Sequence, residues 1–189
     1  MSGKGKMMRA YNDWEMGGAK IFSVKEMADT VRTLGENLSF ALTSGGYAPI
    51  HPGHISQLAA SSKEASFLIV VVNGDDFLIN KHGKAFQPLK VRSQIVSMLR
   101  VVDFVVPFNP SRVDDTTVCE AISIIKPHVF TKGGDRDASN TPEYELCKSL
   151  GVDFVQGMGD DKLWSSSGFL GSWEDYKIRR YIDENSCDF

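Results

Sequence analysis

Two histidines spaced three positions apart, His51 and His54, lie in a glycine-rich stretch of the chain, residues 43–54. The apolar run at 40–42 predicts a short buried strand before this stretch, and the pattern that begins at Ile55 predicts an amphipathic helix after it. Glycines in such a loop let the backbone approach a ligand closely, and the start of the helix offers unpaired N–H groups to an anion. Histidines at this spacing can face the same ligand. The stretch therefore predicts a site for the phosphates of a nucleoside triphosphate.

Three further features follow along the chain: Arg92, the run Lys132-Gly133-Gly134-Asp135, and the run Ser165-Ser166-Ser167. With the sequence HPGH at 51–54, they resemble the cytidylyltransferase-like nucleotidyltransferases, which carry an HxGH signature. The similarity is greatest to the adenylyltransferase domain of bacterial ADP-heptose synthase and less close to glycerol-3-phosphate cytidylyltransferase. It covers residues 20–170. HxGH alone would equally fit a tight turn with incidental histidines, but several motifs in the right order favour the family.

The resemblance implies an enzyme that transfers a nucleoside monophosphate from a triphosphate to a phosphorylated small-molecule acceptor and releases pyrophosphate. The Lys-Gly-Gly-Asp run favours ATP and a sugar phosphate such as heptose 1-phosphate. The alternative is CTP with glycerol 3-phosphate or another alcohol phosphate. Mg²⁺ is implied because it accompanies the triphosphate, and not by any carboxylate cluster in the sequence. Members of the family are often homodimers, and nothing points to nucleic acid or a membrane as a partner.

By this resemblance the catalytic residues are His51, His54, Lys84 and Arg92. The histidines would contact the triphosphate and stabilise the charge of the transition state, each contributing on the order of 3 kcal/mol. Nearby phosphates would favour the charged form of a histidine, which titrates near ~6.5 when free. The structural alternative for His54 is a side chain that caps its own helix, and for Arg92 it is a charge on a helix surface.

Lys81 and Lys84 lie in a polar segment, 78–88, that we expect to be a loop able to close over the phosphates. The alternative is a solvated charged loop. The nucleotide-binding residues implied by the resemblance are Thr43, Ser44, Gly45, Gly46, Tyr47, Gly53, Lys132, Gly134, Asp135, Ser165, Ser166 and Ser167. One of the three serines is expected to be the N-cap of the last helix, and the others to present hydroxyls to the β- and γ-phosphates.

Two departures from the family pattern bear on activity. Tyr47-Ala48 stands where most relatives have an aromatic residue followed by Asp. The loss of that carboxylate makes a nucleotide-binding module without turnover a second hypothesis. The segment 135–143 lacks the aromatic residue that usually follows the Asp in the heptose enzymes, so the identity of the acceptor stays open.

The composition is that of one globular domain. The chain has 189 residues, of which 42% are hydrophobic and 24% charged, and its net charge of −3 gives no support to non-specific nucleic-acid binding. Cys119, Cys147 and Cys187 are far apart in the sequence and suggest neither a disulfide framework nor a zinc site. Because no apolar run is long enough to span a membrane and no signal core is evident, we expect a cytoplasmic protein. Residues 1–19 are interpreted as a flexible arm and 20–189 as the nucleotidyltransferase domain.

The remaining pattern predicts the elements that hold these residues in place. Strands are expected at 40–42, 67–73, 103–108, 129–132 and 152–155, and helices at 24–34, from 55, at 90–102, 116–126 and 142–150, and from 165 to the region of 182. Ser23 and Glu26 form a capping-box pattern at the first helix. This alternation predicts an α/β, Rossmann-like, doubly wound parallel sheet of about five strands, in a single domain with an N-terminal helix. Ligands of such sheets bind at the carboxyl ends of the strands, where the loops after Leu42, Asn73 and Val129–Lys132 would meet.

Overall fold

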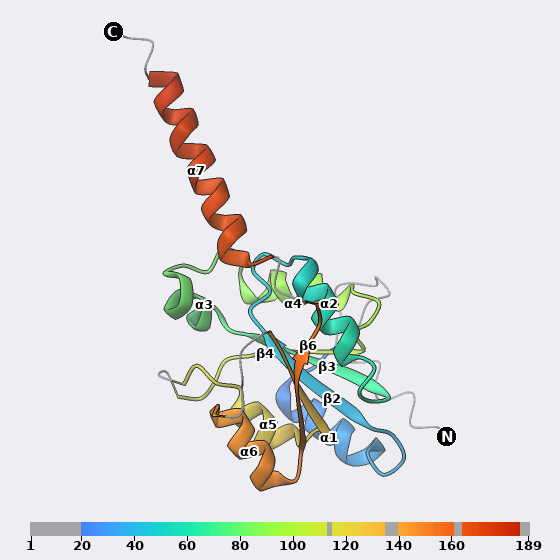
Figure 1. The fold of residues 1–189 in the computed structure, drawn as a ribbon. Helices are drawn as coiled ribbons and strands as arrows, with labels where there is room; N and C mark the ends of the chain where they lie inside the picture. The colour runs from blue at the N-terminus through green and yellow to red at the C-terminus, as the bar shows by residue number, and fades with distance from the viewer. Residues whose placement is uncertain (1–19, 113–114, 135–139, 161–163, 186–189) are drawn as a thin grey trace.

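A computed structural model of the chain describes residues 20–112, 115–134, 140–160 and 164–185 (Figure 1). The arm predicted at 1–19 lies outside the described residues, as do Asp135 and Cys187.

The described residues form a sheet of six strands, all parallel, in the order β1-β4-β3-β2-β5-β6. The strands are β1 Lys20–Ile21, β2 Phe40–Gly45, β3 Phe67–Asn73, β4 Phe104–Phe108, β5 Val129–Gly133 and β6 Asp153–Met158. The prediction of about five strands is corrected by β1, which pairs through Lys20 with Phe104 and through Ile21 with Val105. A strand of two residues is too short to show the alternation by which strands are recognised in a sequence.

The helices are α1 Val24–Leu34, α2 Pro52–Ser61, α3 Asp75–His82, α4 Leu89–Ser97, α5 Cys119–Ile125, α6 Pro142–Leu150 and α7 Ser166–Asn185. The bounds predicted for α1, α6 and β3 are confirmed, and so is the capping box, in which Ser23 Oγ accepts from Glu26 N and the Glu26 carboxylate accepts from Ser23 N. The prediction of a loop over 78–88 is wrong in its first part, because α3 continues to His82. This two-turn helix ends at Gly83, whose φ of 75° is left-handed.

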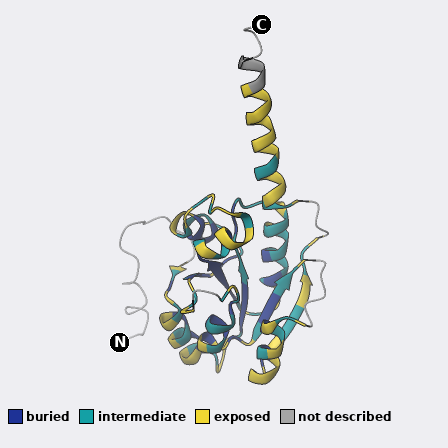
Figure 2. Cartoon of the chain, turned by 90° about the vertical axis from the view of Figure 1, so that its left-hand side faces the viewer, coloured by how far each residue is buried: buried dark blue, intermediate teal, exposed yellow. Residues whose placement is uncertain are grey.

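Helices cover both faces of the sheet, as the doubly wound prediction requires. Strand β3 shows the division, because Ile69 and Val71 pack with Met27 of α1 and Ile122 of α5, whereas its alternate residues face the other side. There Leu68, Val70 and Val72 pack with Leu58 of α2 and Val96 of α4. A strand buried on both faces explains the unbroken apolar run of its sequence. Figure 2 shows the buried sheet between partly exposed helices and α7 extending beyond them.

No helix among the described residues is long and apolar enough to cross a membrane.

Candidate active site

A cavity of about 700 Å³ opens at the carboxyl ends of β2, β5 and β6. In the sheet, β2 has β3 on one side and β5 on the other, so the chain leaves β2 in one direction and returns later on the opposite side. The loops after β2 and β5 therefore diverge and leave a crevice between them, which is where ligands bind in open α/β sheets. Helix α3 and the start of α7 complete the walls.

Most residues predicted for the site line this cavity. They are Gly46, Tyr47, His51, Gly53, His54, Lys81, Lys132, Gly134, Ser165, Ser166 and Ser167. Thr43, Ser44 and Gly45 instead lie within strand β2, and Lys84 is an exposed residue that does not line the cavity. The turn at Gly74 does not reach the cavity either, but the helix that it starts does, through Phe77, Leu78, Lys81 and His82.

The loop after β2 is shaped by a close contact between Tyr47 and Gly45. Tyr47 has a left-handed φ of 51°, which turns its buried ring back over the strand. A Cβ atom on Gly45 would lie 2.9 Å from that ring, so only glycine fits there. The ring also packs against His54, with centroids 5.0 Å apart. Burial raises the pKa of the Tyr47 phenol, which is therefore neutral and serves as a wall of the site.

The two histidines of the signature lie against one another. Their ring centroids are 3.8 Å apart with an interplanar angle of 28°. His51 occupies the N-cap position of α2 without a side-chain capping bond, and the buried Nδ1 of His54 has no hydrogen-bond partner among the described residues. The structure therefore gives no support to the alternative that His54 caps its own helix.

His54 is held in its neutral form. Burial lowers its pKa from 6.5 to about 3, and the positive charges of His51 and Lys81 contribute in the same direction. An anion beside His54 would raise this pKa again, because it would supply the opposite charge.

Two lysines reach the cavity from opposite sides. Lys81 comes from the last turn of α3, with its Nζ 5.8 Å from the centre of the Phe77 ring. Lys132 comes from β5 and forms a 3.4 Å ion pair with Glu143 of α6, whose side chain is only 11% exposed. A lysine paired in this way is held near one position, so it offers a cation whose orientation is set before a ligand arrives.

Gln57 was not among the predicted residues, yet it links three of the elements around the cavity. Its Nε2 donates to Thr43 Oγ1 at 3.0 Å, and that hydroxyl donates to the Thr131 carbonyl of β5 at 3.0 Å. Gly133 and Gly159 both pack directly on Gln57, at its side chain and its backbone respectively. The sequence spacing could have identified Gln57, because it follows His54 by three positions on the same helix and so lies on the same face.

The serine run fixes the start of α7 to the signature loop. Ser165 Oγ accepts from Gly168 N at 3.0 Å, which confirms that one of the serines is an N-cap. Ser166 Oγ donates to the Pro49 carbonyl at 2.9 Å. The ring of Phe169, one turn into α7, lies 6.3 Å from that of His51. The start of this helix is thus part of the cavity wall.

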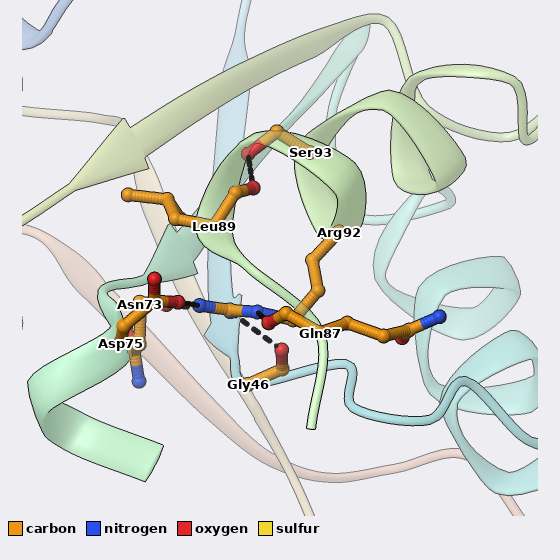
Figure 3. Close-up of polar contacts among 7 residues, drawn as sticks. All are labelled: Gly46, Asn73, Asp75, Gln87, Leu89, Arg92 and Ser93. Atoms are coloured by element: carbon orange, nitrogen blue, oxygen red, sulfur yellow. Dashed lines mark hydrogen bonds and ion pairs between the residues drawn. The ribbon is translucent and has the colours of Figure 1, made fainter. Parts of the chain in front are cut away.

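Arg92 is fully buried and does not line the cavity. Figure 3 shows its polar contacts. Its guanidinium donates to the carbonyls of Gln87 at 2.9 Å, Gly46 at 2.8 Å and Asn73 at 2.6 Å, and to the Asp75 carboxylate at 2.6 Å. The sequence suggested contact with substrate or a helix-surface charge, and the structure shows neither. In the position described, Arg92 holds together the loop after β2, the end of β3 and the start of α3.

Among the described residues, no group of three or more histidine, cysteine or acidic side chains is placed to hold a metal ion. Asp160 is the acidic residue that lines the cavity in the described ranges, and its carboxylate accepts from Ser56 Oγ at 2.7 Å. These residues fit a divalent ion that arrives on a polyphosphate better than one held in a protein cage.

The sequence model of the family described as cytidylyltransferase-like matches residues 42–165, which include the described elements that border the cavity except α7. The chain belongs to this family. The match supports the nucleotidyltransferase class of enzyme that the sequence predicted.

Among curated relatives, the bifunctional protein HldE of Alcanivorax borkumensis is 30% identical over 142 residues, which are 71% of this chain and 28% of that protein. The bifunctional protein HldE of Methylococcus capsulatus is 33% identical over 141 residues, 70% of this chain and 28% of that protein. The chain thus spans 28% of the length of these relatives.

Two solved structures share the fold. A lipopolysaccharide core biosynthesis protein from Thermoplasma volcanium has a TM-score of 0.56 at 24% identity, over 66% of this chain and all of that one. A pantoate-beta-alanine ligase from Francisella tularensis has a TM-score of 0.52 at 15% identity, over 79% of this chain and 69% of that one.

Replacement of Arg92 tests its role in holding the site together. Arg92→Met leaves the Gly46, Asn73 and Gln87 carbonyls without their buried donor, so we expect the free energy of unfolding to fall by about 3 kcal/mol. The matched control is Arg100→Met, at an exposed position near the end of α4, where a change within about 0.5 kcal/mol is expected. Urea denaturation of both variants measures the difference, and equal stabilities would contradict the assigned role.

Substitutions at two glycines can distinguish the effect of backbone strain from that of a steric clash. Gly157 and Gly159 both have a left-handed φ, of 74° and 94°, but only at Gly159 would a Cβ atom meet the backbone of Gln57, 2.7 Å from its N. Gly157→Ala should cost about 1 kcal/mol of stability. Gly159→Ala should cost more and should also weaken nucleotide binding, because α2 must move. Thermal unfolding and nucleotide titration of the two variants check this; an identical effect of both would show that the contact with Gln57 is unimportant.

Proposed function

We propose that this protein transfers a nucleoside monophosphate from a nucleoside triphosphate to a sugar phosphate, and that the pair is ATP and a heptose 1-phosphate or a closely related acceptor. The observation that carries the proposal is the convergence of His51, His54, Lys81 and Lys132 on one cavity at the switch point of the sheet. Four nitrogen groups that can carry positive charge, next to the start of α2, form a site for a polyphosphate. Membership of the cytidylyltransferase-like family supports the reaction class.

The reaction is an in-line displacement at the α-phosphorus. An oxygen of the acceptor phosphate forms a new bond to that phosphorus, and the bond to the bridging oxygen of the β-phosphate breaks, so pyrophosphate leaves with the electron pair. No covalent protein intermediate is needed, and the protein contributes position and charge stabilisation. His51 and His54 would donate to oxygens around the α-phosphorus as negative charge develops there. Lys81 and Lys132 would hold the leaving pyrophosphate from opposite walls of the cavity.

Mg²⁺, bound to the phosphates, would neutralise part of the charge on the leaving group. Asp160 is the carboxylate of the described cavity wall that could face such an ion, directly or through water. The side chains that line the cavity would otherwise bind the nucleotide itself.

The choice of ATP and of a heptose phosphate rests on the resemblance of the Lys132-Gly133-Gly134 run to the ADP-heptose synthase branch and on the HldE relatives at about one third identity. CTP with glycerol 3-phosphate is the alternative within the same reaction class. A binding module without turnover is favoured by one observation, Ala48. This residue is buried, with 3% exposure, and supplies no carboxylate beside the histidines.

The direct test is pyrophosphate release from ATP, CTP, GTP and UTP, each with Mg²⁺, over a panel of sugar and polyol phosphates. Thermal stabilisation by one triphosphate first identifies the nucleotide, because a ligand that binds only the folded state raises its stability. Release with a sugar phosphate supports the proposal, and release with glycerol 3-phosphate and CTP supports the alternative. Tight nucleotide binding with no pyrophosphate release over the whole panel would support the hypothesis of a binding module without turnover.

His51→Ala should reduce turnover by about 10²- to 10³-fold, the typical effect of removing a donor aimed at transition-state charge. The side chain belongs to a partly exposed loop, so the melting temperature should stay close to that of the wild type. Steady-state kinetics and circular dichroism measure both quantities on the same preparation. Unchanged turnover would remove His51 from the mechanism.

The low pKa of His54 predicts proton uptake on nucleotide binding. Phosphates raise this pKa, so the complex binds more protons than the free protein at pH values between the two pKa values. Affinity should therefore increase as the pH falls from about 6.5 towards about 3. Calorimetry in two buffers of different ionisation enthalpy measures the uptake, and His54→Gln should reduce it by the share that His54 contributes. Equal binding enthalpies in both buffers for the wild type would contradict the prediction.

A further inference from the structure

Helix α7 begins in the cavity wall and then extends away from the rest of the protein (Figures 1 and 2). Every residue from 172 to 181 is exposed, including Trp173 at 60% and Tyr176 at 51%. A helix of this length gains most of its stability from packing an apolar face, and Gly168 and Gly171 lower its intrinsic propensity further. We therefore expect the exposed part of α7 to be stabilised by packing against a partner.

The exposed aromatic residues of α7 form a stripe. At 100° per residue, Phe169, Trp173, Tyr176 and Arg180 fall within an arc of about 60°. Trp173 and Tyr176 stack on one another, with ring centroids 5.3 Å apart. Ile178, also exposed, lies on the opposite side of the helix. The stripe thus has an aromatic centre, a phenylalanine at the end near the cavity, and an arginine at the far end.

This stripe is complementary to itself in the antiparallel direction. A two-fold axis midway between residues 174 and 175 places Trp173 of one copy level with Tyr176 of the other, and Phe169 level with Arg180. The centre then consists of aromatic rings from both copies. The ring of Phe169 stacks on Trp164, with centroids 5.4 Å apart, and is 41% exposed, so each arginine would approach the exposed side of that ring in a cation–π arrangement. Antiparallel helix dipoles also attract one another. A parallel pair would instead bring Arg180 against Arg180, where like charges repel.

We propose that a second copy of this chain packs along α7 in this antiparallel register and forms a symmetric dimer. The interface is isologous, as closed two-fold dimers require. Three half-exposed aromatic side chains from each copy remove on the order of 100 Å² each from water. With the flanking polar stems, the pair approaches about 1,000 Å², the lower limit of specific interfaces, so the dimer should dissociate in the micromolar range.

The register also connects the partner with the cavity, a consequence that rests on the proposed function. Phe169 lies 6.3 Å from His51, and the neighbouring serines line the cavity. Arg180 of the second copy, level with Phe169, would therefore bring a positive charge to the mouth of the polyphosphate site. Dimerisation is expected to tighten nucleotide binding for this reason.

Sedimentation velocity of the full chain, from about 1 to about 200 µM, tests the dimer. The wild type should pass from monomer to dimer in this range, and Trp173→Ala should raise the dissociation constant at least about tenfold. Ile178→Ala is the matched control, since it removes a similarly exposed apolar side chain from the opposite face and should leave the dissociation constant unchanged. A monomeric wild type at the highest concentration, or equal effects of both substitutions, would overturn the proposal.

Arg180→Glu tests the register and the link to the site. It should weaken the dimer, because an acidic side chain then faces the aromatic ring of Phe169, and it should lower ATP affinity only at protein concentrations where the wild type is dimeric. An unchanged dissociation constant would overturn the antiparallel register. If the wild type dimerises but binds no triphosphate at any concentration, the proposed function fails and the dimer stands.

Discussion

The structure around the cavity depends on one buried cation. Arg92 is completely enclosed and has its charge balanced by Asp75, whose side chain is partly exposed, and by three backbone carbonyls. Carbonyls at the ends of strands have no further strand to bind, so a buried donor is needed where they turn away from solvent. A guanidinium supplies several donors in a fixed plane, which a lysine cannot do. The loop that carries the histidines and the helix that carries Lys81 are therefore positioned by the same group.

The fold also explains how a chain with a net charge of −3 can hold a site for a polyphosphate. Positive charge is concentrated locally by the fold, with Lys132 fixed by Glu143 on one wall and Lys81 on the other. His54 is kept neutral because burial and the positive charges of His51 and Lys81 disfavour its protonation. The free site thus avoids the full repulsion among its own cations, and the missing charge is supplied when phosphates arrive.

The sequence was sufficient for the parallel sheet, the helices on both faces and most of the cavity wall, because each depends on a local pattern. Strand β3 is a continuous apolar run, and the capping box of α1 lies within four residues. The predictions that failed concern elements that are very short or residues whose roles depend on non-local contacts. Strand β1 is recognisable only by its pairing with β4, and α3 has two turns inside a polar segment. Arg92 and Gln57 show the same limit, since their roles depend on acceptors and neighbours that are remote in the sequence.

The start of α7 connects the exposed part of this helix with the loop that carries the two histidines. Ser166 binds the Pro49 carbonyl, and Phe169 packs beside His51, so the first turn of this helix cannot shift without moving the loop that carries the histidines. The family match ends at residue 165, just before this helix begins. The part of the cavity that matches the family model and the helix that lies beyond the match therefore meet at the serine run. The hydrogen bond between Ser166 and Pro49 is the contact through which a partner on α7 would act on the site.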